Sequence, residues 1–182
     1  MSAPSPEEED SNEVTFVVEK DEVDALVGRI DELEGAVEPA VYHRVSAVVE
    51  RYQEFGQLLD PHLEGWIAPL ASVLRAQARA GDAADMVLVQ RVSRVLHTFA
   101  TVRGYKTVVK FFPHEVRDLE PALELLLAQG EPADTTHWET KYVILLWLSI
   151  IVRVPFDLAS IDTLQGTGDG GSLLDRIMSV AQ

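Results

Sequence analysis

The sequence contains no cysteine. This absence excludes disulfide bonds, zinc sites built from thiolates and cysteine nucleophiles, and it fits a reducing compartment. The chain also has no run of about 20 apolar residues, the length that a membrane-spanning helix needs. Its first residues are acidic, whereas a secretory signal is basic and then apolar. We therefore expect no membrane span.

Basic residues are scarce and unevenly placed. The chain has 15 Lys and Arg against 30 Asp and Glu, and its net charge of −15 argues against a nucleic-acid binder. Residues 1–24 are strongly acidic, whereas residues 75–110 carry a surplus of lysine and arginine. This split predicts two surfaces with different partners, or one surface that the acidic tail can screen. A solvated tail and ordinary helix faces are the alternative.

No catalytic constellation is visible. Gly166, Gly168 and Gly171 fit the G-x-G-x-x-G pattern of a dinucleotide loop, but no βαβ unit surrounds them and no Walker lysine follows. The histidines do not pair at the four-residue spacing of a helical metal site. The sequence therefore predicts no enzymatic activity, no metal and no cofactor. The five histidines are His43, His62, His97, His114 and His137.

The composition divides the chain into four parts. Residues 1–20 are expected to form a disordered acidic tail, because they cannot bury enough apolar surface to fold. Residues 21–160 are expected to form a helical segment, residues 161–171 a flexible glycine-rich loop, and residues 172–182 the start of a further helix. That last helix has an apolar face that nothing downstream covers, so we expect an N-terminal or truncated piece of a longer protein.

Apolar residues recur at the 3.6-residue period of a helix in segment after segment. The predicted fold is therefore all-α, a HEAT/armadillo-type solenoid of stacked helix pairs that repeat about every 45–55 residues. An irregular helical bundle is the alternative. A short helix is predicted over 21–33, and longer helices are predicted to begin at Pro39, Asp60, Ala83, Pro113 and Thr135 or Thr136, with kinks at Pro69 and Pro121.

The most apolar stretch runs from Val143 to Val152 and contains one polar residue, Ser149. It predicts a helix that is buried on nearly all sides, with Thr135 or Thr136 as the N-cap and Glu139 completing a capping box. A buried strand is the alternative for a run with so many β-branched residues.

Cations and large rings alternate in one connecting segment, VRGYKTVVKFF, over residues 102–112. Connections between helices are frequent positions for binding residues, and arginine and aromatic side chains dominate interface hot spots. The alternative is a buried connector whose charged groups merely reach the solvent. The candidate partner-binding residues are Arg91, Arg94, Arg103, Tyr105, Lys106 and Lys110.

Three phrases carry a resemblance to a known family: LLDPHLE at 58–64, VRGYKTVVKFFPHEVRDLEPALELL at 102–126, and WETKYVILLWLSIIVRVPFDL at 138–158. Their order and spacing between Tyr52 and Leu158 resemble the N-terminal region of the tubulin-folding cofactor D family. The acidic tail and the glycine loop do not share in this resemblance.

The resemblance implies a cytoplasmic, cytoskeleton-associated chaperone with a HEAT/armadillo solenoid. It implies β-tubulin as a partner, and action on the α/β-tubulin heterodimer together with cofactors E and C and an Arl-type small GTPase. The heterodimer is assembled or taken apart, and its GTP hydrolysis is promoted. The hydrolysing site then belongs to tubulin. A scaffold or structural cap with no partner contact of its own is the alternative function.

Overall fold

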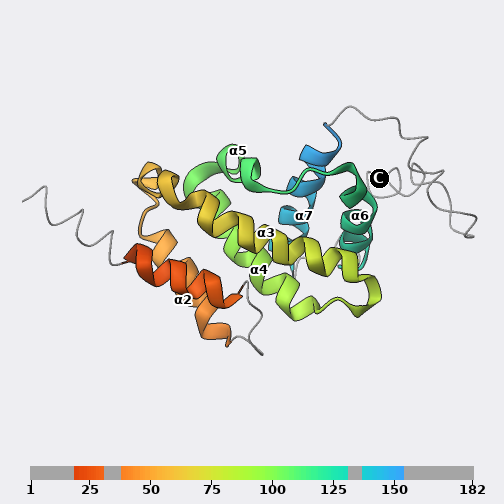
Figure 1. Ribbon diagram of the computed structural model, residues 1–182, viewed down its shortest axis with the longest axis horizontal. Helices are drawn as coiled ribbons and strands as arrows, with labels where there is room; N and C mark the ends of the chain where they lie inside the picture. Colours follow the sequence, from red (N-terminus) through yellow and green to blue (C-terminus); the bar gives the residue numbers. More distant parts are fainter. Residues whose placement is uncertain (1–18, 31–37, 131–136, 154–182) are drawn as a thin grey trace, which may run out of the picture.

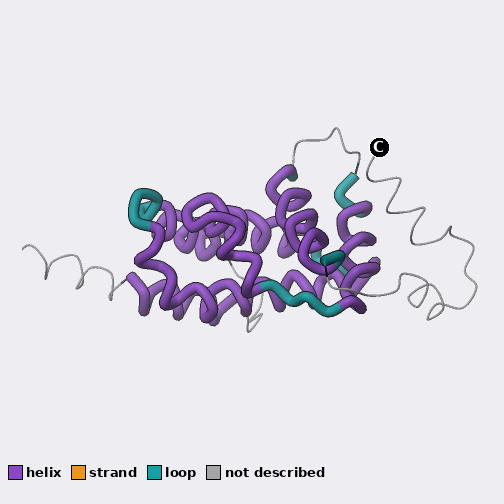
Figure 2. Tube along the Cα trace, turned by 90° about the horizontal axis from the view of Figure 1, so that it is seen from above, coloured by secondary structure: helices purple, strands orange, loops and turns teal. Residues whose placement is uncertain are grey.

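The computed structural model describes residues 19–30, 38–130 and 137–153, and within them it contains helices, turns and loops but no strand (Figure 2). The all-α prediction is confirmed. No helix among these residues is long and apolar enough to cross a membrane. The predicted glycine loop at 161–171 and the predicted helix at 172–182 lie outside the described residues.

Residues 19–30 form the first described helix, which begins two residues before the predicted start. The longer helices that follow are α2 (Pro39–Glu50), α3 (Leu63–Ala80), α4 (Met86–Phe99), α6 (Leu119–Leu127) and α7 (Trp138–Ile151), with the short α5 (Tyr105–Val108) between α4 and α6. Short 3₁₀ turns join them: η1 (Gly56–His62), η2 (Gly81–Ala83), η4 (Val109–Phe111) and η5 (Val116–Asp118), and η3 (Ala100–Gly104) is a π-helical turn.

The longer helices pack as two stacked hairpins (Figure 1). Helix α3 pairs with α4 and α6 pairs with α7, while α3 also contacts α6 and α4 contacts α7. Helix α2 continues the α4–α7 layer, since it packs on α4. The helix of residues 19–30 meets α3, where the Trp66 indole N–H donates a 2.6 Å hydrogen bond to Asp24. Two layers of neighbouring helices are the arrangement of a helical solenoid.

The core lies between the two layers. It holds Trp66, Trp147 and Phe99 together with aliphatic side chains from every longer helix. Each helix supplies one apolar face to it, as the 3.6-residue periodicity predicted. Burying these faces is the main term that stabilises the stack.

The ends of α3 and α4 follow from local chemistry. Gly81 takes a φ of 56° at the end of α3, a conformation that glycine adopts without strain. Asp85 caps α4, because its carboxylate accepts the backbone N–H groups of Val87 and Leu88 at 3.0 and 3.1 Å. Helix α3 runs on through Pro69.

Three predicted helix starts are wrong. Ala83 lies in η2, and α4 begins at Met86. Asp60 does not cap a helix: it lies inside η1, and α3 begins at Leu63. The fourth predicted helix begins at Leu119 instead of Pro113, after η5. Pro121 therefore falls in the first turn of α6, where a missing N–H costs no helical hydrogen bond.

Helix α7 departs from its prediction at two points. It begins at Trp138, with His137 as an N-cap whose side chain makes no capping bond. It is also buried on one face only: Val143, Ile144 and Trp147 are in the core, whereas Leu145 is half exposed. A run that is apolar throughout has no periodicity, so only packing decides which side is covered.

A buried carboxylate joins α3 to the segment before α6. Asp118 has no exposed side-chain surface, and it accepts hydrogen bonds from the guanidinium groups of Arg75 and Arg79. The Arg75 guanidinium also forms an ion pair with the Glu115 carboxylate, with 2.6 Å between Nη2 and Oε1. Hydrogen bonds from Arg117 and Arg75 lower the pKa of Glu115 to about 2. These ion pairs fix the stacking of the second hairpin on the first.

Candidate partner-binding surface

The six candidate residues form two separate groups. Arg91 and Arg94 lie in the middle of α4, and the other four lie in the segment from η3 to η4. Twelve residues separate Arg91 from Arg103, which corresponds to about 18 Å along a helix that rises 1.5 Å per residue. The predicted basic band is therefore not one continuous surface.

The first group, Arg91 and Arg94, contacts side chains of neighbouring helices. The Arg91 guanidinium lies over the Tyr42 ring, 5.8 Å from its centroid, and Arg94 lies 3.7 Å from the Glu139 carboxylate of α7. Both line a small hollow of about 90 Å³ between α2 and α4. These contacts tie neighbouring helices together, so the group offers little free charge to a partner.

Arg103 in the second group also has an internal partner. Its guanidinium binds both carboxylate oxygens of Asp60 on η1, with 2.7 Å between Nη2 and Oδ2. This bidentate bond lowers the pKa of Asp60 below its usual value and raises the pKa of Arg103. Arg103 therefore fixes η1 against η3.

Two glycines allow this contact. A Cβ on Gly56 would stand 2.7 Å from the backbone carbonyl oxygen of Val102, so η1 approaches η3 at a distance that only glycine permits. Gly104 has φ 91° and ψ 132°, a conformation that other residues rarely adopt. It ends the π-helical turn and opens α5. Single π-helical turns are frequent at functional sites.

The rest of the second group faces solvent. Tyr105 is 47% exposed, and Lys106 and Lys110 are exposed beside it. Neither lysine forms an ion pair with another described residue, although Lys110 is close enough to Asp60 to help lower the pKa of that carboxyl. Unpaired cations next to an exposed ring are suited to an acidic partner.

Two further apolar side chains lie at the same end. Phe55 and Leu58, which flank Gly56, are 60% and 51% exposed. We name the surface formed by Phe55, Leu58, Tyr105, Lys106 and Lys110 the η1–α5 end. Phe55 continues the apolar spacing of α2, but it is exposed because α2 stops at Glu50 and four turn residues follow it.

Other basic residues of the 75–110 segment form ion pairs within the fold. Arg75 and Arg79 bind Asp118, as described above. No local pattern in the sequence indicates this arrangement, since the carboxylate lies 43 residues from Arg75. The net positive charge of the segment is thus largely neutralised by acids from other elements.

A second exposed aromatic surface lies on α7. Trp138 and Tyr142 are partly exposed, and both meet the His97 ring edge-on, with centroids 4.7 and 5.2 Å away. Burial lowers the pKa of His97. Trp138 is 49% exposed and Tyr142 is 36% exposed.

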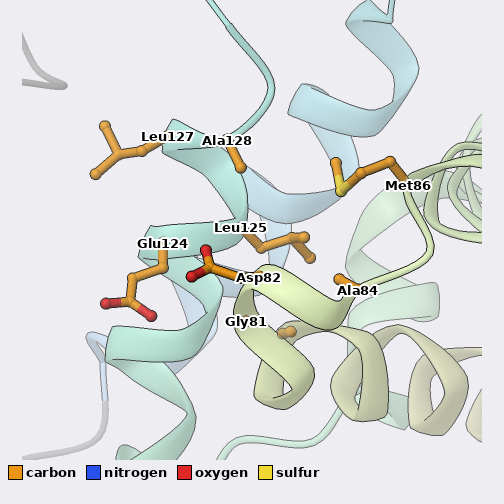
Figure 3. Close-up of a pocket in the computed structure, with 9 residues that line it drawn as sticks. Gly81, Asp82, Ala84, Met86, Glu124, Leu125, Leu127 and Ala128 are labelled. Carbon is orange, nitrogen blue, oxygen red and sulfur yellow. The ribbon is translucent and has the colours of Figure 1, made fainter.

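A groove of about 590 Å³ runs between the end of α3 and α6. Asp82 points its carboxylate towards α6, whereas the carboxylate of Glu124 points outward (Figure 3). Alanine, leucine and methionine side chains line the remainder. The groove has acids but no histidine, lysine or hydroxyl among its lining residues, so it holds no hydroxyl nucleophile with an adjacent histidine or lysine base.

Among the described residues, no group of three His, Asp or Glu could hold a metal ion.

The model of one family, described as "Tubulin-specific chaperone D-like, ARM repeat", matches residues 49–182. The chain belongs to this family. Its membership confirms the family predicted from the sequence motifs, and the armadillo-type repeat agrees with the stacked hairpins. The whole η1–α5 end lies within the matched residues.

Two curated relatives are similar over most of the chain. "Tubulin-folding cofactor D" of Schizosaccharomyces pombe is 29% identical over 86% of this chain and 14% of its own length. "Tubulin-specific chaperone D" of Dictyostelium discoideum is 22% identical over 82% of this chain and 15% of its own length. The chain thus spans about one seventh of these relatives. No solved structure matches it significantly.

The phrases that carry the family resemblance contact one another in the structure. Asp60 of LLDPHLE binds Arg103 of VRGYK, and the Trp147 indole of the third phrase donates a 2.7 Å hydrogen bond to the Pro113 carbonyl of the second. These motif residues therefore hold the architecture. Tyr105, Lys106 and Lys110 of the second phrase are exposed and make no such internal bond, so they are the better candidates for a partner.

Proposed function

We propose that this chain is a segment of a tubulin-folding chaperone and that its η1–α5 end contacts tubulin. The observation that carries the proposal is the juxtaposition of exposed Phe55, Leu58 and Tyr105 with Lys106 and Lys110, in a chain that belongs to the tubulin-specific chaperone D-like family. Aromatic anchors supply binding energy, and peripheral lysines steer an acidic partner.

The wider activity is proposed for the longer protein, because the chain covers only about one seventh of its curated relatives. We propose β-tubulin as the first partner. With cofactors E and C and an Arl-type GTPase, the protein would assemble or take apart the α/β-tubulin heterodimer in the cytoplasm and promote hydrolysis of the GTP bound to tubulin. The chain itself would supply contacts and no catalytic group.

The test is capture of purified α/β-tubulin, β-tubulin and the Arl-type GTPase by the 182-residue chain, at low and at physiological salt. We expect salt-sensitive capture of a tubulin species, since exposed charge contacts weaken as ionic strength rises. Lys106→Glu/Lys110→Glu is expected to weaken this binding about tenfold at low salt, and Tyr105→Ala about as much by removing an anchor.

The matched control is Arg29→Glu/Arg153→Glu, which changes the net charge by the same amount at exposed positions outside the η1–α5 end. Its affinity should stay within about twofold, and helical circular dichroism should be equal in all variants. Equal loss in both double variants would reduce the lysines to a general charge effect. No capture at either salt would favour the alternative, a structural cap that makes no partner contact of its own.

A further inference from the structure

The first described helix is anchored beside the η1–α5 end. The Glu19 carboxylate lies 2.5 Å from the guanidinium of Arg51 and accepts the Tyr52 hydroxyl at 2.6 Å. Burial and this hydrogen bond together raise the pKa of Tyr52. In Figure 1 the red start of this helix lies at the same end of the molecule as the tan η1.

Few residues separate Tyr52, which binds Glu19, from the exposed side chains of Phe55 and Leu58. The Phe55 backbone N–H donates to the Tyr52 carbonyl at 3.0 Å, and the Leu58 N–H donates to the Phe55 carbonyl at 3.0 Å. One tight turn therefore leads from the residue that binds Glu19 to Phe55, and another leads to Leu58. The polypeptide that precedes Glu19 must start from this location.

That polypeptide is complementary to the surface in charge and in polarity. Residues 1–18 contain five acids and neither lysine nor arginine, and the stretch 14–18 reads VTFVV. The surface offers Lys106 and Lys110 with three exposed apolar side chains. An extended residue spans about 3.3–3.6 Å, so residues 7–18 reach up to about 40 Å from Glu19.

We propose that residues 7–18 bind the η1–α5 end of their own chain, with the acids against Lys106 and Lys110 and the VTFVV stretch against Phe55 and Leu58. A tether this short gives an effective concentration in the millimolar range, so weak contacts suffice to hold the segment. The proposal rests on charge and position, and it holds whether or not the partner is tubulin.

The experiment uses the absence of cysteine. A Ser5→Cys variant of the 182-residue chain takes a single nitroxide label, and amide signals are compared before and after reduction of the label. At low salt we expect the signals of Tyr105 and Lys106 to lose more than half of their intensity, while signals from α6 keep theirs. At about 0.5 M salt the loss should largely disappear, because charge screening then acts over a few ångströms.

Charge variants of the labelled chain isolate the cause. Lys106→Glu/Lys110→Glu should restore the signal of Tyr105, and so should neutralisation of Glu7, Glu8, Glu9 and Asp10 to their amides. The control Arg29→Glu/Arg153→Glu should keep the loss. Full intensity at Tyr105 in the unmodified labelled chain, or an equal loss in the lysine variant, overturns the proposal.

A mixing experiment separates contacts within a chain from contacts between chains. Labelled chains without ¹⁵N are added to unlabelled ¹⁵N chains, and no signal loss is expected at Tyr105. A loss in this mixture would show that the segment binds a second copy, which contradicts the proposal. None of these samples contains tubulin, so their outcome is independent of the capture experiment.

Discussion

The backbone carbonyl oxygen of Val102 lies so close to Gly56 that a Cβ at position 56 would stand 2.7 Å from it. This oxygen belongs to the backbone, so no side chain can rotate away to make room. Gly56→Ala must therefore push η1 away from η3 and strain the bond between Asp60 and Arg103. We expect a loss of about 1–3 kcal/mol in the free energy of unfolding, the usual cost of overpacking, measured by urea denaturation.

The control for this prediction is Gly65→Ala. Gly65 lies in α3, and a Cβ there meets no atom within 4 Å. Alanine is favoured over glycine in a helix, so this variant should gain up to about 1 kcal/mol. If Gly56→Ala is as stable as the unmodified chain, the close approach of η1 and η3 is not a feature of the folded protein in solution.

The buried carboxylate of Asp118 gives the second prediction. Asp118→Asn removes the anion that Arg75 and Arg79 share, but Arg75 keeps its ion pair with Glu115, and the two arginines are 21% and 39% exposed and keep part of their hydration. The cost should therefore fall below that of a fully buried pair, at about 1–3 kcal/mol. Because Asp118 joins the two hairpins, hydrogen exchange should accelerate in α6 more than in α2.

Arg117→Gln controls for the loss of a charge near the same site. Arg117 is 70% exposed and pairs only locally with Glu115 in the structure, so its replacement should change stability by less than about 0.5 kcal/mol. Similar costs for Asp118→Asn and Arg117→Gln would mean that the buried network adds nothing beyond a surface ion pair.

Much of the stack could be predicted from the sequence. The 3.6-residue periodicity located α2, α3 and α4. Asp60 could not be predicted in the same way. An aspartate followed by proline is a good helix start by local chemistry, but the bond to Arg103, 43 residues away, holds it inside a 3₁₀ turn. Contacts at that separation have no local signature.

The candidate surface shows the same limit. Tyr105, Lys106 and Lys110 were identified from their composition in a connecting segment, and the structure leaves them exposed. Phe55 was missed because the apolar spacing continues for five residues after α2 has ended. A periodic pattern indicates a face only while the helix lasts, and nothing in the local sequence shows that the chain turns at Arg51.

His97 gives a prediction for pH. Burial lowers its pKa below the usual value of about 6.5, and the nearby Glu139 carboxylate only partly opposes this shift. The unfolded chain therefore binds a proton at a higher pH than the folded chain does. The contribution of His97 to stability is complete above about pH 6.5 and is lost as the pH falls towards the lower pKa of the folded state. NMR titration of the ring should give a value below 6.5.

The variant His97→Phe keeps an aromatic ring against Trp138 and removes the titration. Its unfolding free energy should fall less between pH 7.5 and pH 5.5 than that of the unmodified chain. His43→Gln, at an exposed position on α2, controls for the loss of an imidazole and should leave the fall unchanged. A ring that titrates above 6.5, or an identical fall in His97→Phe, contradicts the prediction.

Trp147 joins α7 to the connection before α6, and it gives the last prediction. Its side chain is 1% exposed, and its indole N–H donates to the Pro113 carbonyl at 2.7 Å. Trp147→Phe removes the donor and leaves both a cavity and a carbonyl without its partner. We expect a loss of about 2–4 kcal/mol in the free energy of unfolding, from the combined cavity and hydrogen-bond terms.

Trp138→Phe makes the same chemical change on the same helix, but at a side chain that is 49% exposed. Its cost should stay below about 1 kcal/mol, because water can fill the space and solvate the neighbouring groups. Thermal unfolding of both variants, followed by circular dichroism, measures the difference. Equal costs would show that the bond to Pro113 and the burial of Trp147 do not hold α7 in place.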